Sequence, residues 1–178
     1  MLVDTHAHLD FSDFDSQRQE VIARAAEAGV KYIINVSSDL RGCLASLDLI
    51  KKYENIFASI GIHPHSAAEV GEEDFKRIPG LLKNEKVVAV GEVGLDYYRN
   101  LSPQDKQKDV FVRFIGLSLE SKLPLIIHSR EAEADTIDIL KSRAAGLTLK
   151  GVVHCFSGSR DFCQKCLDLG LYISFTCN

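Results

Sequence analysis

The stretch Leu2-Val3-Asp4-Thr5-His6-Ala7-His8-Leu9 opens the sequence with an apolar run that leads into two histidines. In a β-strand, successive side chains point to opposite faces, so His6 and His8 share a face while Ala7 points away. Two imidazoles on one face, at the carboxyl end of a short strand, form a pair of ligands for a divalent metal ion. The alternative is a pair of ordinary surface histidines on an edge strand. The positions of the other histidines decide between the two.

The composition is that of an ordinary globular protein. The chain has 178 residues, of which 46% are hydrophobic and 26% charged, which is enough for one sizeable core. The formal net charge is −4, so the sequence lacks the basic character typical of nucleic-acid-binding proteins. A DNA substrate therefore requires bound metal ions that supply positive charge locally.

The five cysteines lack the even number and regular spacing of a disulfide framework. No signal peptide and no apolar run long enough to span a bilayer is recognisable in the sequence. These features predict a reduced, cytoplasmic protein. Cys163 and Cys166 form a C-x-x-C pair within a predicted helix, but no second pair completes a zinc site. A zinc or redox role for this pair is the weaker interpretation.

Short apolar runs alternate with helical patterns along the whole sequence. The predicted strands are Leu2–His8, Lys31–Val36, Ile56–Ile62, Val87–Val93, Pro124–Ile127, Lys150–Val153 and Leu171–Phe175. The predicted helices are Ser16–Ala28, Asp39–Tyr53, Glu72–Lys83, Pro103–Ser121, Ala132–Ala145 and Arg160–Leu169. Ser102 is the expected N-cap of the fourth helix, with Pro103 at its first position.

These repeated βα units predict an α/β fold of the (β/α)8 TIM-barrel type, formed by residues 1–178 as one domain. A doubly wound sheet is the competing architecture, but it would normally place a glycine-rich phosphate loop after the first strand, where this chain has its two histidines. A closed barrel needs eight strands and about 250 residues, whereas seven strands are predicted here. We therefore expect an incomplete barrel that lacks the final strand and helix. Its open edges would allow self-association.

The remaining metal-binding residue types also lie at the predicted strand ends. His63 follows the third strand, Glu92 ends the fourth, His128 ends the fifth and His154 ends the sixth. In a β/α barrel the carboxyl ends of the strands form the face where catalytic groups converge. Because every histidine of the sequence maps to this face, a metal site is the favoured interpretation.

This set of ligands suits a pair of divalent cations. Imidazoles bind zinc, manganese or iron, and a carboxylate can bridge two ions, for which Glu92 on the central strand is the natural candidate. Two such ions can hold the attacking and departing oxygens of a phosphoester. Arg130 offers a fork-shaped donor for a phosphate or, alternatively, forms a structural ion pair with a nearby acid. His63 and His65 either contact substrate or cap the strand.

Five segments of the sequence together resemble the TatD family of metal-dependent deoxyribonucleases, which are amidohydrolase-like TIM barrels. They are Asp4-Thr5-His6-Ala7-His8, Gly61-Ile62-His63-Pro64-His65, Gly91-Glu92-Val93-Gly94-Leu95-Asp96-Tyr97-Tyr98-Arg99, Ile127-His128-Ser129-Arg130 and His154-Cys155-Phe156-Ser157-Gly158. The resemblance implies hydrolysis of DNA phosphodiester bonds, often as a 3′–5′ exonuclease, with two divalent metal ions such as zinc, magnesium or manganese.

The resemblance also implies a role for each matching position. His6 and His8 would hold one ion, His128 and His154 the other, and Glu92 would bridge them. It suggests substrate contacts at His63 and Arg130.

One feature departs from the family pattern. Family members continue to an eighth strand whose aspartate completes the first metal site, and no residue here corresponds to it. We therefore expect a weakened first site in these 178 residues. Two other functions stay open: a hydrolase of the amidohydrolase or phosphotriesterase type that acts on small molecules, and a catalytically silent form that only binds metal or a partner.

Overall fold

The computed structural model describes residues 1–143 and 148–176, and its strands form one curled sheet. The strands pair in chain order and every pairing is parallel. Their bounds are β1 (Leu2–Ala7), β2 (Val30–Val36), β3 (Ile56–Ile60), β4 (Val87–Asp96), β5 (Leu125–Arg130), β6 (Gly151–Val153) and β7 (Tyr172–Ile173). Because the order runs in one direction without reversal, the barrel-type fold is confirmed and the doubly wound alternative is wrong.

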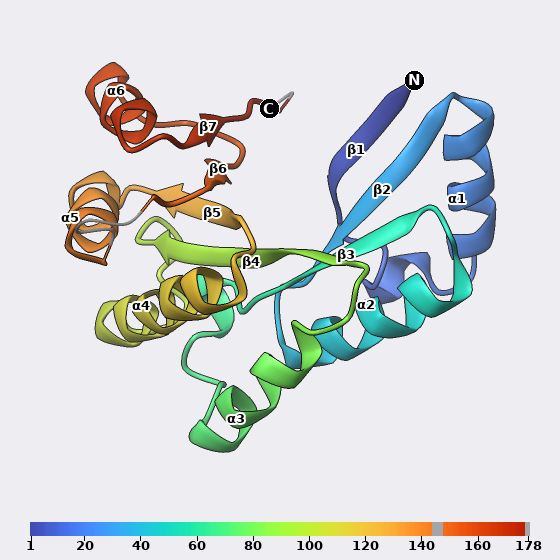
Figure 1. Ribbon diagram of the computed structural model, residues 1–178, viewed down its shortest axis with the longest axis horizontal. Coiled ribbons are helices and arrows are strands. Elements are labelled where there is room, and N and C mark those ends of the chain that lie inside the picture. Colours follow the sequence, from blue (N-terminus) through green and yellow to red (C-terminus); the bar gives the residue numbers. More distant parts are fainter. Residues whose placement is uncertain (144–147, 177–178) are drawn as a thin grey trace.

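The helices connect successive strands and lie on the outer side of the curled sheet (Figure 1). They are α1 (Arg18–Glu27), α2 (Leu40–Lys52), α3 (Glu72–Leu81), α4 (Gln104–Ser121), α5 (Glu133–Arg143) and α6 (Arg160–Asp168), with the 3-10 turns η1 (Ser12–Phe14) and η2 (Pro64–Ser66). Every predicted strand and helix is present, with its ends shifted by a few residues. Ala144 and Ala145 of the predicted fifth helix lie outside the described residues. No helix in the described ranges is long and apolar enough to cross a membrane.

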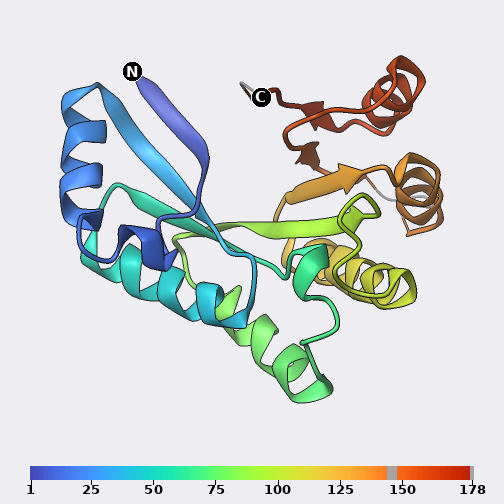
Figure 2. The same cartoon turned by 180° about the vertical axis from the view of Figure 1, so that it is seen from behind.

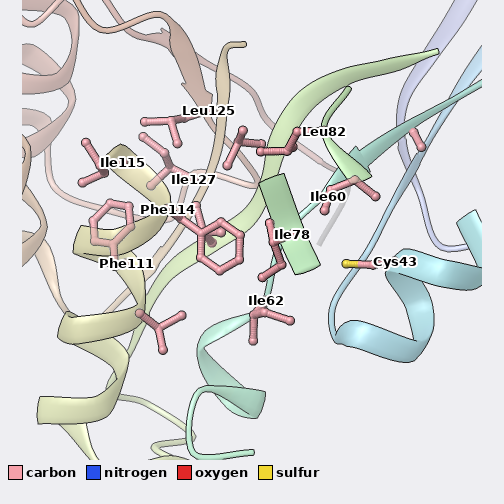
Figure 3. Close-up of a cluster of buried hydrophobic side chains, with 14 of the residues drawn as sticks. Cys43, Ile60, Ile62, Ile78, Leu82, Phe111, Phe114, Ile115, Leu125 and Ile127 are labelled. Atoms are coloured by element: carbon pink, nitrogen blue, oxygen red, sulfur yellow. The ribbon is translucent and has the colours of Figure 1, made fainter. Parts of the chain in front are cut away.

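The two faces of the sheet bury different apolar side chains. On the helix-covered face, Leu125 and Ile127 of β5 belong to the same core cluster as Phe114 of α4 (Figure 3). Ile126 points the other way and belongs to a small second cluster that includes Ala89 of β4. Because strand side chains alternate, β5 is apolar on both faces, as expected of a parallel sheet covered on both sides.

Strands β4 and β5 extend beyond their predicted ends at Val93 and Ile127. Their paired segment continues through the register Gly94↔His128 and ends at Asp96↔Arg130. Gly94 makes this close pairing possible, because its φ is +143° and a Cβ there would collide with the carbonyl oxygen of His128. Glu92 and His128 therefore lie within rigid strands, not in the loops that follow them.

The start of α4 differs from the predicted cap. Pro103 is the N-cap, with an extended backbone, and the first helical residue is Gln104. The Ser102 hydroxyl donates instead to the carbonyl oxygen of His65 at 2.7 Å and accepts the backbone N–H of Ala68 at 3.0 Å. The predicted Ser102 cap is wrong because the Ser102 hydroxyl bonds to the turn after β3 and not to the first turn of α4.

The sheet is open between its first and last strands. Strands β1 and β7 form the two ends of the curled sheet, and Figures 1 and 2 show both chain termini on this open side. A groove of about 410 Å³ lies there, lined by Leu2–His6 on one side and by His154 and Ser174–Thr176 on the other. Apolar side chains are exposed at both edges, among them Val3 and Phe175.

Candidate metal centre

Most of the predicted ligands converge near the carboxyl ends of the strands, around one buried carboxylate. Glu92 of β4 is only 4% exposed. Its Oε2 lies 3.2 Å from Nε2 of His6, and its Oε1 lies 3.0 Å from Nδ1 of His128. Oε1 is also 3.9 Å from Nε2 of His63. The two oxygens of one carboxylate thus face two groups of imidazoles, which is the geometry expected of a bridging ligand.

The surroundings of Glu92 keep it charged. Burial alone would raise the pKa of this carboxyl, but His128, His6 and His63 around it hold the pKa well below its usual value. A buried carboxylate without a permanent cation beside it is costly. The charge of Glu92 therefore favours positive charge in the space between the histidines.

The first group consists of His6, His8 and Glu92, whose candidate ligand atoms all lie within 4.8 Å of one another. Both ring nitrogens of His6 are buried. Among the described residues Nδ1 has no hydrogen-bond partner, and Nε2 meets only Glu92 Oε2, at 3.2 Å and without hydrogen-bond geometry. Such an unsatisfied group costs about 1–3 kcal/mol. The Nδ1 of His8 lies 2.7 Å from the carbonyl oxygen of Val36, so Nδ1 carries the proton and Nε2 has a free lone pair. These donors fit a divalent cation.

The second group differs from the predicted one. His63, Glu92 and His128 offer ligand atoms within 4.8 Å of one another. The predicted ligand His154 instead packs against His6, with ring centroids 3.4 Å apart and ring planes 6° apart. Burial lowers the pKa of His154 to about 4 and that of His63 to about 3, so both rings are neutral at pH 7. The neutral form is the one that binds metal.

His63 is oriented by its own turn. It is the N-cap of η2, and its Nδ1 accepts the backbone N–H of His65 at 3.2 Å. In the neutral ring the proton is then on Nε2, which faces Glu92. His63 thus caps the turn η2 and not the strand, and its predicted substrate contact stays a prediction.

Arg130 lies at the end of β5, on the rim of the site. Its guanidinium carbon is 3.9 Å from the ring centroid of Tyr98, which is itself 56% exposed. Among the described residues Arg130 forms no ion pair with Glu131 or Glu133. Stacking on an aromatic ring holds the guanidinium in a fixed plane while leaving its N–H groups free for a ligand.

Asp96 belongs to the site, although no role was predicted for it from the sequence. Its Oδ2 lies 2.9 Å from Nε2 of His128 and 3.0 Å from Nε2 of His65. Burial would raise the pKa of this carboxyl, but hydrogen bonds from the Arg99 backbone and from the two histidines lower it. The available signal was spacing, because Glu92 and Asp96 are four residues apart on one strand and alternation places both on the same face.

Residues 3–178 match the family described as TatD related DNase. The chain belongs to the TatD family.

Curated TatD-family relatives span more residues than this chain. The metal-dependent hydrolase YabD of Bacillus subtilis (strain 168) is 43% identical over 175 residues, which cover 98% of this chain and 68% of YabD. The 3′-5′ ssDNA/RNA exonuclease TatD of Salmonella typhimurium is 32% identical over 175 residues, covering 98% of this chain and 67% of that protein. The chain thus spans about two thirds of the length of these relatives.

A solved structure of the TatD family confirms the fold. The TatD homologue YJJV of Escherichia coli K12 superimposes with a TM-score of 0.89 at 30% sequence identity, covering 97% of this chain and 66% of that one. The curled seven-stranded sheet is therefore the TatD fold over the length that the two share.

Proposed function

We propose that the protein is a divalent-metal-dependent hydrolase that cleaves DNA phosphodiester bonds, as a 3′–5′ exonuclease with a two-metal site. The observation that carries this proposal is the position of Glu92, whose two oxygens face separate groups of histidines. Membership in a family with metal-dependent hydrolases supports it. The printed activity of the Salmonella relative, on ssDNA and RNA, supports a nucleic-acid substrate.

In this proposal Glu92 would be shared by the two ions. His6 and His8 would complete the first site, and His128 and His154 would complete the second. The unsatisfied ring nitrogens of His6 and the neutral ring of His154 are the observations that support these assignments. When bound, a pair of divalent ions supplies a water that is deprotonated near neutral pH and stabilises the charge on a phosphate.

The residues on the rim would hold the substrate. His63 would donate its Nε2 proton to a phosphate oxygen, because its Nδ1 already accepts the backbone N–H of His65. Arg130 would bind a second phosphate oxygen, with its plane fixed by Tyr98. Local positive charge from the ions would reconcile an anionic substrate with a chain whose net charge is −4.

The open side of the sheet between β1 and β7 is where a further strand would fit. We propose that residues 1–178 form one TIM-barrel domain that lacks a final strand and helix, and that such a strand would lie in the groove between β1 and β7. Its two walls carry the unpaired edges of the sheet, which are the places where a parallel sheet accepts a further strand. The proposal places an additional aspartate ligand for the His6–His8 site on that strand, as the resemblance implies.

The test is a metal-reconstituted assay of the purified protein on a 5′-labelled single-stranded oligonucleotide, with EDTA as the control. We expect a ladder of products shortened from the 3′ end that disappears with EDTA and returns with added zinc, manganese or magnesium. A parallel panel contains phosphotriester and amide substrates. Turnover of that panel without DNA cleavage would establish the small-molecule hydrolase instead. Metal binding without turnover of either class would establish the catalytically silent form.

A further inference from the structure

The carboxylate of Asp96 is one of the most enclosed polar groups near the candidate metal centre. It lies at the end of β4 and is 1% exposed. Its Oδ2 accepts from both His128 Nε2 and His65 Nε2, and its Oδ1 accepts the backbone N–H of Arg99 at 2.8 Å. Both oxygens are thus engaged in hydrogen bonds.

The main chain of Asp96 is also fixed. Gln107 of α4 accepts the Asp96 N–H at 2.8 Å through its Oε1 and donates to the Asp96 carbonyl oxygen at 3.2 Å through its Nε2. Gln107 is fully buried, so this pair of hydrogen bonds is shielded from water. The carboxylate of Asp96 is therefore held at a defined point between two strands and a helix.

We propose that Asp96 is a positioning residue, which fixes the ring of His128 with its proton on Nε2 and its Nδ1 lone pair facing Glu92. This inference rests on the proposed metal-dependent function. Asp96 is not one of the proposed metal ligands, and in this role it would leave Nδ1 of His128 as the atom that binds the ion.

The position of the proton on the His128 ring depends on its two neighbours. Both nitrogens of His128 face a carboxylate, Nδ1 toward Glu92 at 3.0 Å and Nε2 toward Asp96 at 2.9 Å. A neutral imidazole carries one proton, and a carboxylate accepts but cannot donate. Both oxygens of Asp96 accept hydrogen bonds already, so Asp96 offers the Nε2 proton of His128 a fixed acceptor. A metal ion beside Glu92 then meets the Nδ1 lone pair.

His65 shares the same oxygen but has a separate position. It lies on η2, is partly exposed, and is not in either group of candidate ligands. Its side chain helps to hold Asp96, whereas its backbone N–H orients His63. Removing the imidazole of His65 therefore tests whether Asp96 acts through His128 or through the η2 turn.

The experiment is a zinc titration in competition with a chromophoric chelator, performed on the wild-type protein and on four variants. Loss of a partner behind a ligating histidine typically costs about 10–100-fold in metal affinity. We expect Asp96→Ala to lose about that factor at one of the two zinc sites while the other keeps its affinity. Asp96→Asn, whose carbonyl oxygen still accepts from Nε2, is expected to lose less than Asp96→Ala.

Two variants serve as controls. Tyr97→Phe removes a 2.6 Å hydrogen bond to Asp135 from the neighbouring residue and contacts no histidine, so its zinc affinities should equal those of the wild type. His65→Ala keeps the contact between Asp96 and His128, so its loss of zinc affinity should be smaller than that of Asp96→Ala. Unchanged zinc affinity in Asp96→Ala would overturn the proposal, as would an equal loss at both sites in Asp96→Ala and His65→Ala.

A second measurement needs no substitution. Long-range ¹H–¹⁵N correlation spectra of the wild-type protein report which ring nitrogen of His128 carries the proton, in the zinc-loaded form and in the metal-free form at alkaline pH. We expect a proton on Nε2 in both forms, and an Nε2 without a proton in either form would overturn the role of Asp96. Wild-type protein that takes up no zinc counts against the proposed function alone, because the metal-free spectrum still tests the tautomer.

Discussion

The rings of His6 and His154 lie face to face across the open side of the sheet, with centroids 3.4 Å apart. His6 comes from β1 and His154 from the residue after β6, so this contact joins two strands that are far apart in the sheet order. In the proposed site the two rings serve different ions, which requires each to direct a nitrogen toward Glu92. A pair of substitutions tests whether His154 or His63 completes the second site.

We expect His154→Ala to reduce the bound zinc from two ions to one, and His63→Ala to keep both ions while raising KM for single-stranded DNA. The physical reason is that His63 Nδ1 is already engaged by the His65 N–H, which leaves only a protonated nitrogen for the site. Zinc content by mass spectrometry checks the first outcome and steady-state kinetics the second. The reverse pattern would assign His63 as the ligand.

Glu92→Gln should abolish high-affinity binding of both ions, because the amide cannot bridge them and carries no charge. We expect metal content close to zero after gel filtration and a loss of at least about 100-fold in DNA hydrolysis. Glu85→Gln, at an exposed position outside the site, is the matched control and should retain wild-type values. Two ions retained in Glu92→Gln would show that Glu92 is not the bridge.

Gly94→Ala should destabilise the protein by about 3 kcal/mol, since a Cβ would collide with the His128 carbonyl oxygen in a backbone conformation that favours glycine. Gly116→Ala in α4 is the matched control, because no atom lies within 4 Å of its added Cβ. That variant should be stabilised by about 0.5–1 kcal/mol. Urea unfolding measures both free energies, and equal stability of the two variants would contradict the close pairing of β4 and β5.

Arg130→Gln should raise KM for single-stranded DNA by about tenfold and flatten its salt dependence, with a small effect on kcat. Arg143→Gln, at the exposed carboxyl end of α5, changes the net charge equally and should leave KM unchanged. Tyr98→Phe keeps the ring beneath the guanidinium and should behave like the wild type. A fall in kcat without a change in KM would place Arg130 in the chemistry instead of in substrate binding.

Cys43 and Cys166 should resist alkylation at pH 8, because burial raises the pKa of each thiol to about 12. The reactive thiolate is then present only at strongly alkaline pH, and reactivity should rise as the pH approaches that value. Peptide mapping after iodoacetamide treatment checks this, with the partly exposed Cys163 as the internal reference. Rapid modification of Cys166 would revive the redox interpretation of the C-x-x-C pair, both of whose cysteines are free thiols in the structure.

The sequence predicted the fold well because each βα unit carries its own signal. Leu125–Ile127 is apolar at every position, a pattern typical of a short strand buried on both faces. The N-caps of α2 and α6 are likewise set by nearby residues, because the side chains of Asp39 and Ser159 accept hydrogen bonds from backbone N–H groups of the first helical turn. Ser102 was misread because its hydroxyl bonds to His65, a partner that no local pattern reveals.

The candidate site was predictable in its residue types and less so in its pairings. Strand order alone brings His6, Glu92 and His128 to one end of the sheet. The stack of His154 on His6 and the contact between Asp96 and His128 depend on side-chain directions that strand order does not determine. Self-association through the edges of β1 and β7 stays a prediction, and the exposed Val3 and Phe175 at those edges motivate it.

The Ser102 hydroxyl has one further consequence for the site. It ties the turn that carries His63 to the start of α4, whereas Glu92 and His128 belong to the sheet. The same helix holds the main chain of Asp96 through Gln107, and Asp96 in turn contacts His128. The amino-terminal end of a single outer helix thus braces two imidazoles that come from different strands, so damage to that helix end should disturb both together.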